Sequence, residues 1–209
     1  MKFDHFADLP KDHPFDYQTL CQLLDAYSNP RDKIKRLLHD QDIIRIKKGL
    51  YILSAKHGGH VDPKCMANLI HGPSYISLEY AMSYWQIIPE RVHVVTSVTC
   101  QRKKSFTTPV GRFEYQHLHA RAYAPGIMLE SAGTCRFMIG SREKVLLDKL
   151  AFLPQKLGVS DMGKYLESDL RVDMQVLGEM NSATIASLAA NYTRPTVQSF
   201  GKWFKKFKK

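Results

Sequence analysis

The chain has 209 residues, of which 44% are hydrophobic, and a formal net charge of +10 at pH 7. This length suits one large domain or a small domain joined to a medium one, and a charge excess of this size is typical of proteins that meet nucleic acid, an anionic membrane or an acidic protein. No run of about 18 apolar residues argues for a membrane-spanning helix, and Met1–Asp16 lacks the apolar core of a secretory signal, so we expect a cytoplasmic protein.

The N-terminal third predicts two helices after a polar arm at residues 1–14. Apolar residues at helical spacing predict the first helix from Phe15 to Tyr27. The second is predicted from Pro30 to Gln41, because the Asn29 side chain can cap a helix start and proline suits the first helical position. Its apolar stripe consists of Ile34, Leu37 and Leu38.

The spacing of apolar residues changes after Asp42 from that of a helix to that of a strand. Residues Ile43–Leu53 predict a strand, a turn and a second strand, and Gly49 permits the positive φ that a tight hairpin often needs. The alternation directs Ile44 and Ile46 inward and Arg45 and Lys47 outward.

This order of elements predicts a winged helix-turn-helix DNA-binding domain over residues 1–58, ended by a Gly- and Pro-containing linker at residues 54–63. Residues 31–48 contain seven Lys or Arg and three Asp. Arginine can pair with guanine and lysine can contact phosphate. The predicted DNA-binding residues are Asn29, Arg31, Lys33, Lys35, Arg36, Arg45, Lys47 and Lys48. The alternatives are a small helical subdomain with a solvated charged face and a winged helix that binds an acidic protein.

Residues 59–209 predict a larger mixed α/β domain, so the expected fold class is α+β. Strands are expected at Val92–Thr99, twice within Phe106–Leu118, and at Arg136–Ile139. The expected helices are Pro63–Ile70, Ser77–Gln86, Ser141–Phe152, Met162–Leu170, Met174–Glu179, Thr184–Ala190 and a closing helix from Thr196.

Two further basic segments are candidate contacts for nucleic acid or a partner. The first is a turn containing Arg102, Lys103 and Lys104, with Arg112 expected near it across a hairpin; it is also explained as an exposed basic turn. The second is the C-terminal tail, with Lys202, Lys205 and Lys206 opposite aromatic residues at helical spacing. That tail predicts a helix packed on its own domain, with nucleic acid, an acidic partner or a membrane surface as alternatives.

Catalytic signals are weak, and we expect no enzyme activity, metal or cofactor. His117 and His119 share a strand face but lack further ligands at familiar spacing, and Glu143 and Asp148 do not share a helix face. No Walker A loop, Gly-x-Ser-x-Gly or His-Glu-x-x-His motif occurs. The cysteines are far apart, which predicts reduced thiols rather than disulfides: Cys21, Cys65, Cys100 and Cys135.

Several of these segments resemble AbiEi-type antitoxins. Residues 37–51, with Ile43-Ile44-Arg45-Ile46-Lys47-Lys48-Gly49-Leu50-Tyr51, resemble their recognition helix and wing. Gly72-Pro73-Ser74-Tyr75-Ile76-Ser77-Leu78-Glu79-Tyr80-Ala81 resembles the start of their second domain. Residues 92–99, 111–115 and Arg142-Glu143-Lys144-Val145-Leu146-Leu147-Asp148 extend the resemblance, which covers roughly Leu20–Phe152.

The resemblance implies an antitoxin of a type IV toxin–antitoxin pair. Such proteins repress their own operon by binding inverted repeats in double-stranded promoter DNA. Their partner is a nucleotidyltransferase-like toxin, with which they form no stable complex, and the second domain is associated with neutralising it. One difference is the short N-terminus: a single clear helix precedes the recognition helix, with residues 3–9 as the candidate for another.

Overall fold

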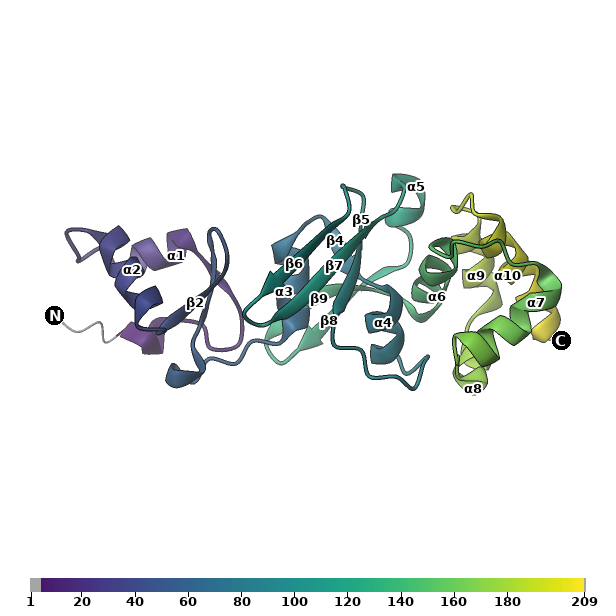
Figure 1. Cartoon of the computed structure of the whole chain (residues 1–209), viewed down its shortest axis with the longest axis horizontal. Coiled ribbons are helices and arrows are strands. Elements are labelled where there is room, and N and C mark those ends of the chain that lie inside the picture. Colours follow the sequence, from purple (N-terminus) through teal and green to yellow (C-terminus); the bar gives the residue numbers. More distant parts are fainter. Residues whose placement is uncertain (1–4, 209) are drawn as a thin grey trace.

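The computed structural model describes residues 5–208 and shows a mixed α+β protein (Figure 1). Three parts follow one another along an elongated molecule: an N-terminal unit (residues 5–58), a sheet unit (59–140) and a helical unit (141–208). The termini of the described chain therefore lie at opposite ends.

The N-terminal unit contains two helices and a three-stranded antiparallel sheet. The helices are α1 (Tyr17–Leu23) and α2 (Pro30–His39), and a short 3₁₀ helix, η1, covers His5–Asp8. The strands β1 (Phe15–Asp16), β2 (Ile43–Lys47) and β3 (Leu50–Leu53) are arranged in the order β1-β3-β2. The predicted second helix and the predicted hairpin are confirmed, and Gly49 has a φ of 82° at the turn.

The first predicted helix, Phe15–Tyr27, was too long at both ends, because α1 covers only Tyr17–Leu23. Asp16 caps α1 by accepting a hydrogen bond from the Thr19 amide at 2.9 Å, so the helix begins at Tyr17. The residue before it, Phe15, pairs with Tyr51 as part of β1. A strand of two residues next to a cap carries no periodic signal of its own, which explains why the pattern missed it.

The predicted polar arm is partly built into the core. Residues 1–4 of that arm lie outside the described residues. Leu9 is only 2% exposed, and the Phe6 ring stacks on His57 with a centroid distance of 3.8 Å. Within residues 5–14 the helix considered for residues 3–9 is limited to the single turn of η1.

Both faces of the three-stranded sheet are covered by other parts of the chain. The alternation of apolar and polar residues along the strands did not predict this. One face carries Ile43, Tyr51 and Leu53 and packs on the two helices. The other carries Ile46, Leu50 and Ile52, which join the large apolar core of the rest of the chain. Ile46 therefore faces inward as expected, but toward the sheet unit rather than toward α2.

The predicted linker, residues 54–63, is ordered and contacts its neighbours. A 3₁₀ turn, η2, covers Ala55–His57, and a Cβ on Gly59 would lie 2.0 Å from the Leu53 carbonyl oxygen. The His60 amide donates to the Lys11 carbonyl at 2.7 Å, and Thr134 donates to Asp12. These contacts hold the first two parts of the chain against each other.

The sheet unit is a six-stranded mixed sheet in the order β6-β7-β5-β4-β9-β8. Its strands are β4 (Ser74–Ile76), β5 (Val95–Thr99), β6 (Lys104–Thr108), β7 (Gly111–His117), β8 (Ile127–Ala132) and β9 (Cys135–Gly140). The helices are α3 (Pro63–Ile70), α4 (Leu78–Tyr84) and α5 (Ala120–Tyr123). Of these, β4, β8 and α5 were not predicted.

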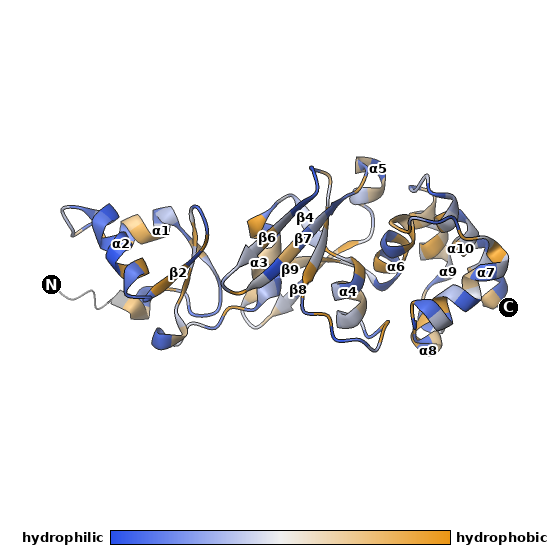
Figure 2. Ribbon diagram, viewed as in Figure 1, coloured by the Kyte–Doolittle hydropathy of each residue, from blue (hydrophilic) through white to orange (hydrophobic). Residues whose placement is uncertain are grey.

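The helical unit closes the molecule with helices that carry the remaining apolar stripes (Figure 2). They are α6 (Arg142–Ala151), α7 (Val159–Lys164), α8 (Met174–Glu179), α9 (Ser182–Ala189) and α10 (Pro195–Phe207). A π-helical turn, Tyr165–Asp169, continues α7. Phe200 and Phe204 are buried, so the expectation of a closing helix packed on its own unit is confirmed.

A buried polar network joins the sheet unit to the helical unit. The Asp148 carboxylate accepts hydrogen bonds from Tyr75, Ser77 and Tyr192 at 2.6–2.7 Å, and Lys144 Nζ lies 2.9 Å from Asp148 Oδ1. Burial and the Asp148 charge raise the pKa of Tyr75 and Tyr192 far above the ordinary value, so both phenols stay protonated donors.

Two of the resembling motifs meet in this network. Tyr75 and Ser77 come from residues 72–81, and Lys144 and Asp148 come from residues 142–148. Because all four side chains are buried, these motifs act in holding the fold together.

The prediction of four reduced thiols was wrong for two of them. Cys65 of α3 and Cys135 of β9 form a disulfide, whereas Cys21 and Cys100 are free. The two bonded residues are 70 positions apart, and only the packing of α3 on the sheet brings them together. Within residues 5–208 no helix has the length and apolar character to cross a bilayer.

Candidate nucleic-acid interface

The outer face of α2 is the strongest cationic surface of the N-terminal unit. The 3.6-residue period buries Ile34 and Leu37 against α1 and the sheet and leaves Arg31, Lys35 and Arg36 exposed. Figure 2 shows α2 mostly in the hydrophilic colour, with an apolar strip. Within the described residues, neither Arg31 nor Arg36 forms an ion pair, so both guanidinium groups face solvent.

Three predicted contacts at the start of α2 already have local partners. Asn29 accepts from the Asp32 amide at 3.4 Å and donates to its carboxylate at 2.7 Å, which confirms the cap. Lys35 Nζ lies 3.2 Å from Asp32, in an exposed pair worth little in stability. The Lys33 ammonium lies 5.3 Å from the centre of the Tyr27 ring. These side chains remain at the surface, with Lys33 partly buried.

The basic hairpin divides into exposed and engaged residues. Arg45 and Lys48 are exposed. Lys47 instead donates to the Leu69 and Ile70 carbonyl oxygens, at 2.7 and 2.9 Å, at the C-terminal end of α3. Burial lowers the pKa of its ammonium.

Lys47 is therefore a correction to the predicted DNA-binding set. A register shift between Arg45 and Lys47 accompanies this change of direction at the end of β2. Cations are favoured at helix C-termini, where carbonyl groups lack partners, and Lys47 occupies such a position. Its role is to tie the hairpin to the sheet unit.

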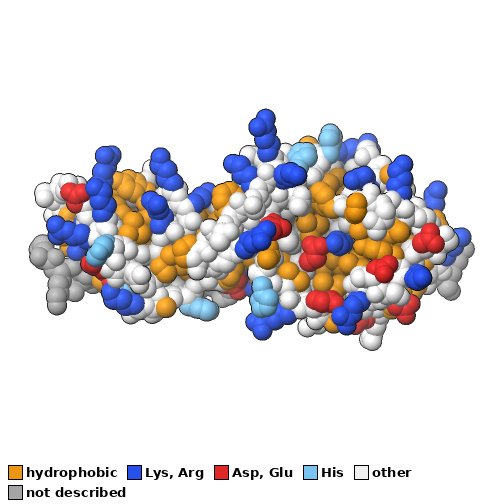
Figure 3. Space-filling model, in the orientation of Figure 1, with side chains coloured by type: hydrophobic (Ala, Val, Ile, Leu, Met, Phe, Trp, Pro, Cys, Tyr) orange, Lys and Arg blue, Asp and Glu red, His pale blue; other side chains and the backbone are white. Residues whose placement is uncertain are grey.

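The packing leaves the outer face of α2 uncovered. The sheet unit contacts the face of the small sheet that carries Ile46, Leu50 and Ile52, whereas α2 packs on the opposite face. Lys and Arg side chains stand along the upper edge of the molecule, on the N-terminal and the sheet unit (Figure 3). The exposed surface of residues 29–36 is thus open to a large partner.

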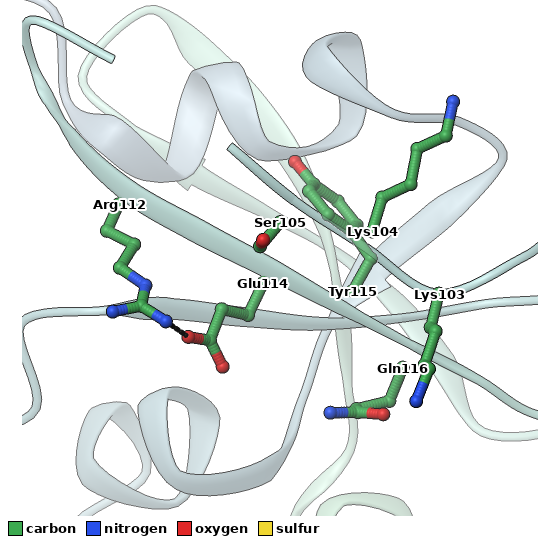
Figure 4. A pocket seen from close by; sticks show the side chains of 7 residues that line it. All are labelled: Lys103, Lys104, Ser105, Arg112, Glu114, Tyr115 and Gln116. Atoms are coloured by element: carbon green, nitrogen blue, oxygen red, sulfur yellow. Dashed lines mark ion pairs between the residues drawn. The ribbon is translucent and has the colours of Figure 1, made fainter. Parts of the chain in front are cut away.

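The basic turn between β5 and β6 brings Lys103 and Lys104 to one pocket of about 340 Å³, which Arg112 also lines (Figure 4). Figure 4 shows Lys103 and Lys104 pointing in different directions. Arg112, expected beside this turn, forms an ion pair of 2.6 Å with Glu114 and lies opposite Thr107 in the hairpin. Of the basic residues of this turn, Arg102 and Lys104 also line a second cavity, of about 520 Å³.

That second cavity contains residues that the sequence did not suggest. It is lined by His71, Cys100, Gln101, Arg102, Lys104 and His117. His71 Nε2 lies 3.2 Å from the Arg102 carbonyl oxygen. Because His71 directly follows α3, this cavity adjoins the end of α3 that Lys47 contacts. No local pattern relates residues 71, 102 and 117. The parallel pairing of β5 with β7 places His117 opposite Thr99 near the β5–β6 turn, and His71 reaches this turn from the end of α3.

The C-terminal lysines lie at the far end of the molecule. Lys202, Lys205 and Lys206 are exposed on α10. Figure 1 places α10 opposite the N-terminal unit, so these lysines and α2 cannot contact one short duplex together. Lys209 lies outside the described residues.

His117 is the last residue of β7, whereas His119 lies after the strand and caps α5, so the prediction that they share a strand face was wrong. His117 Nδ1 lies 2.9 Å from the Gln101 carbonyl oxygen, and His119 accepts from the Arg121 amide at 3.3 Å at the start of α5. Across residues 5–208, no group of three His, Cys, Asp or Glu is placed to hold a metal ion.

No protein-family model matches the chain, and no curated protein matches it either. The resemblance to AbiEi-type antitoxins therefore depends on the motifs quoted for it.

Proposed function

We propose that the chain is a DNA-binding transcriptional repressor that acts through a winged helix. The order of β1, α1, α2 and the β2–β3 hairpin, with strand order β1-β3-β2, supports this proposal. In this proposal α2 enters the major groove and the hairpin approaches the neighbouring phosphates. The proposed contacts are Asn29, Arg31, Lys33, Lys35, Arg36, Arg45 and Lys48.

The observation that carries the proposal is the open face of α2. Arg31 and Arg36 are exposed, and the rest of the chain packs on the other side of the small sheet. An arginine in this position can pair with the O6 and N7 atoms of guanine.

Arg102 and Lys104 extend this surface. The hairpin contacts the end of α3 through Lys47, and His71, directly after α3, contacts the Arg102 backbone. The proposed surface therefore continues from the hairpin to the β5–β6 turn. Lys103, which does not line the cavity shared by His71 and Arg102, and the three α10 lysines at the far end of the molecule are left out of it.

The test is fluorescence anisotropy with a labelled duplex from the region upstream of the gene and a scrambled duplex of equal length. We expect binding whose log K falls by about 0.9 per phosphate neutralised as log salt rises. Arg36→Ala should cost about 1–3 kcal/mol on the upstream duplex if Arg36 contacts a base. Lys202→Ala, at the far end, is the matched control and should bind as the wild type does.

No binding at low salt would reject the DNA-binding proposal, and equal binding by Arg36→Ala would remove Arg36 from the proposed base contacts. Retention of a stoichiometric acidic protein, with no retention of DNA, would favour the alternative that the N-terminal unit docks a protein.

From the resemblance we also propose that the chain is the antitoxin of a type IV pair, with a nucleotidyltransferase-like toxin as partner and without a stable complex. Supporting this, the sheet and helical units form most of the chain and leave α2 uncovered, so they are available for a separate task. Co-expression with a toxin-like product of the adjacent gene tests it. Growth rescue by both the wild type and Arg36→Ala would separate this activity from DNA binding; failure of the wild type would refute it.

A further inference from the structure

A cavity of about 390 Å³ lies beside α5, where the sheet unit meets the helical unit. We name it the α5 cavity. Its polar lining comes from the end of β7, from α5 and its N-cap, and from the loop between α9 and α10: His117, His119, Arg121, Asn191, Tyr192, Thr193 and Arg194. Its volume lies in the range of pockets that hold small molecules.

The side chains that line the α5 cavity carry a net positive charge. Arg121 and Arg194 line it together with two histidines, and no Asp or Glu is among its described lining residues. Within the described part of the chain, neither arginine forms an ion pair. Because no carboxylate neutralises these two guanidinium groups, they can bind an anion in the cavity.

Both arginines are held in place by the backbone. Arg121 Nη2 donates to the Ala190 carbonyl at 3.2 Å, and Arg194 Nε donates to the Ala151 carbonyl at 2.9 Å. Each bond uses one donor of the guanidinium and leaves the others for a ligand. Holding the side chains in advance reduces the entropy lost when a ligand binds.

The floor of the α5 cavity is also fixed. Tyr192 and Ala122 line the cavity, and Lys144 donates to the Tyr192 hydroxyl at 2.6 Å and to the Ala122 carbonyl. The buried network described above therefore shapes this site. An apolar wall of Leu118, Ala151 and Phe152 completes the lining.

The geometry points to a binding site for a phosphate monoester with an apolar or planar group attached, such as a mononucleotide. Arg121 and Arg194 would bind the phosphate, because planar guanidinium groups match phosphate oxygens in geometry and charge. The apolar wall would contact the sugar or the base. This inference does not depend on the DNA-binding proposal.

The test is calorimetric titration of the DNA-free full chain with AMP, ribose 5-phosphate and adenosine. We expect AMP to bind, and adenosine to bind at least about tenfold more weakly because it lacks the phosphate. Binding of ribose 5-phosphate would show that the phosphate suffices; its absence would add base recognition to the site. Because no DNA is present, failure here leaves the DNA-binding proposal standing.

Arg121→Gln and Arg194→Gln should each weaken AMP binding about tenfold or more, while Arg31→Gln, a matched loss of charge on α2, should leave it unchanged. Circular dichroism checks that the variants fold; if neither does, the comparison of AMP with adenosine on the wild type decides. Equal affinity for AMP and adenosine, no AMP binding at millimolar concentration, or unchanged binding in both folded variants would overturn the inference.

Discussion

Lys144 and Asp148 lie one turn apart on α6, and their charged atoms are 2.9 Å apart with both side chains fully buried. Each polar atom of the pair has a partner: Lys144 also donates to Tyr192 and Ala122, and Asp148 also accepts from Tyr75, Ser77 and Tyr192. A buried charge pair is tolerated only when it is satisfied in this way.

Lys144→Met should therefore destabilise the protein strongly. The substitution keeps the chain length near that of lysine but leaves the Asp148 carboxylate buried without a cation. The expected loss in free energy of unfolding is about 3–5 kcal/mol, measured by urea denaturation at pH 7.

Arg142→Ala is the matched control on the same helix. Its ion pair with Glu179 is 3.3 Å long and exposed, so the expected loss is about 0–1 kcal/mol. Equal losses for the two variants would contradict the role given to the buried network.

Local chemistry made the N-terminal unit predictable. The Asn29 cap, Pro30 at the first helical position and the positive φ of Gly49 each act within a few residues, so a single sequence carries them. The same holds for α3 and α8, whose ends agree with the expected residues.

The missed features depend on contacts between distant residues. Strand β4 has only three residues, and the edge strand β8 includes Glu130 and Ser131, so neither shows a clear alternation. A pattern treats Lys144 as a solvent-facing lysine, because its partners Tyr75 and Tyr192 are remote in sequence. The engagement of Lys47 by α3 is of the same kind.

Reduction of the Cys65–Cys135 disulfide should lower stability. The bond closes a loop of about 70 residues, and cross-links of this kind typically contribute about 2–4 kcal/mol by restricting the unfolded chain. The measurement is urea denaturation with and without reductant. The variant Cys65→Ser should resemble the reduced protein and lose its sensitivity to reductant, whereas Cys21→Ser should keep it. No effect of reductant on the wild type would contradict the prediction.

The Asp42 carboxylate should make the N-terminal unit sensitive to acid. Burial acts to raise its pKa, but hydrogen bonds from Lys56 at 2.6 Å and with His57 at 2.7 Å outweigh burial, so the pKa falls below 3.8. A carboxyl with a lowered folded pKa stabilises the protein above its unfolded pKa, and that contribution is lost as the pH falls through the folded value.

Asp42→Asn should therefore be less stable than the wild type at pH 6, and the gap should narrow as the pH falls below about 4. Thermal midpoints from pH 7 to pH 2.5 measure this, with Asp32→Asn, on exposed α2, as the control. A gap that widens toward low pH would contradict the sign of the pKa shift.

Lys47 and Lys48 are adjacent, but their substitution should affect different properties: stability for Lys47 and DNA binding for Lys48. The Lys47 ammonium binds two carbonyl groups at the end of α3, so Lys47→Ala should lower the free energy of unfolding by about 1–3 kcal/mol, as expected for lost charge-assisted hydrogen bonds. Lys48 is exposed at the turn, so Lys48→Ala should leave stability within about 0.5 kcal/mol of the wild type.

In the anisotropy assay we expect the opposite order of effects. Lys48→Ala should reduce the slope of log K against log salt by about 1 on both the upstream and the scrambled duplex, because one phosphate contact is lost. Folded Lys47→Ala should keep the wild-type slope. A reduced slope in Lys47→Ala alone would mean that the hairpin leaves α3 when DNA binds, and it would remove the structural basis for excluding Lys47 from the interface.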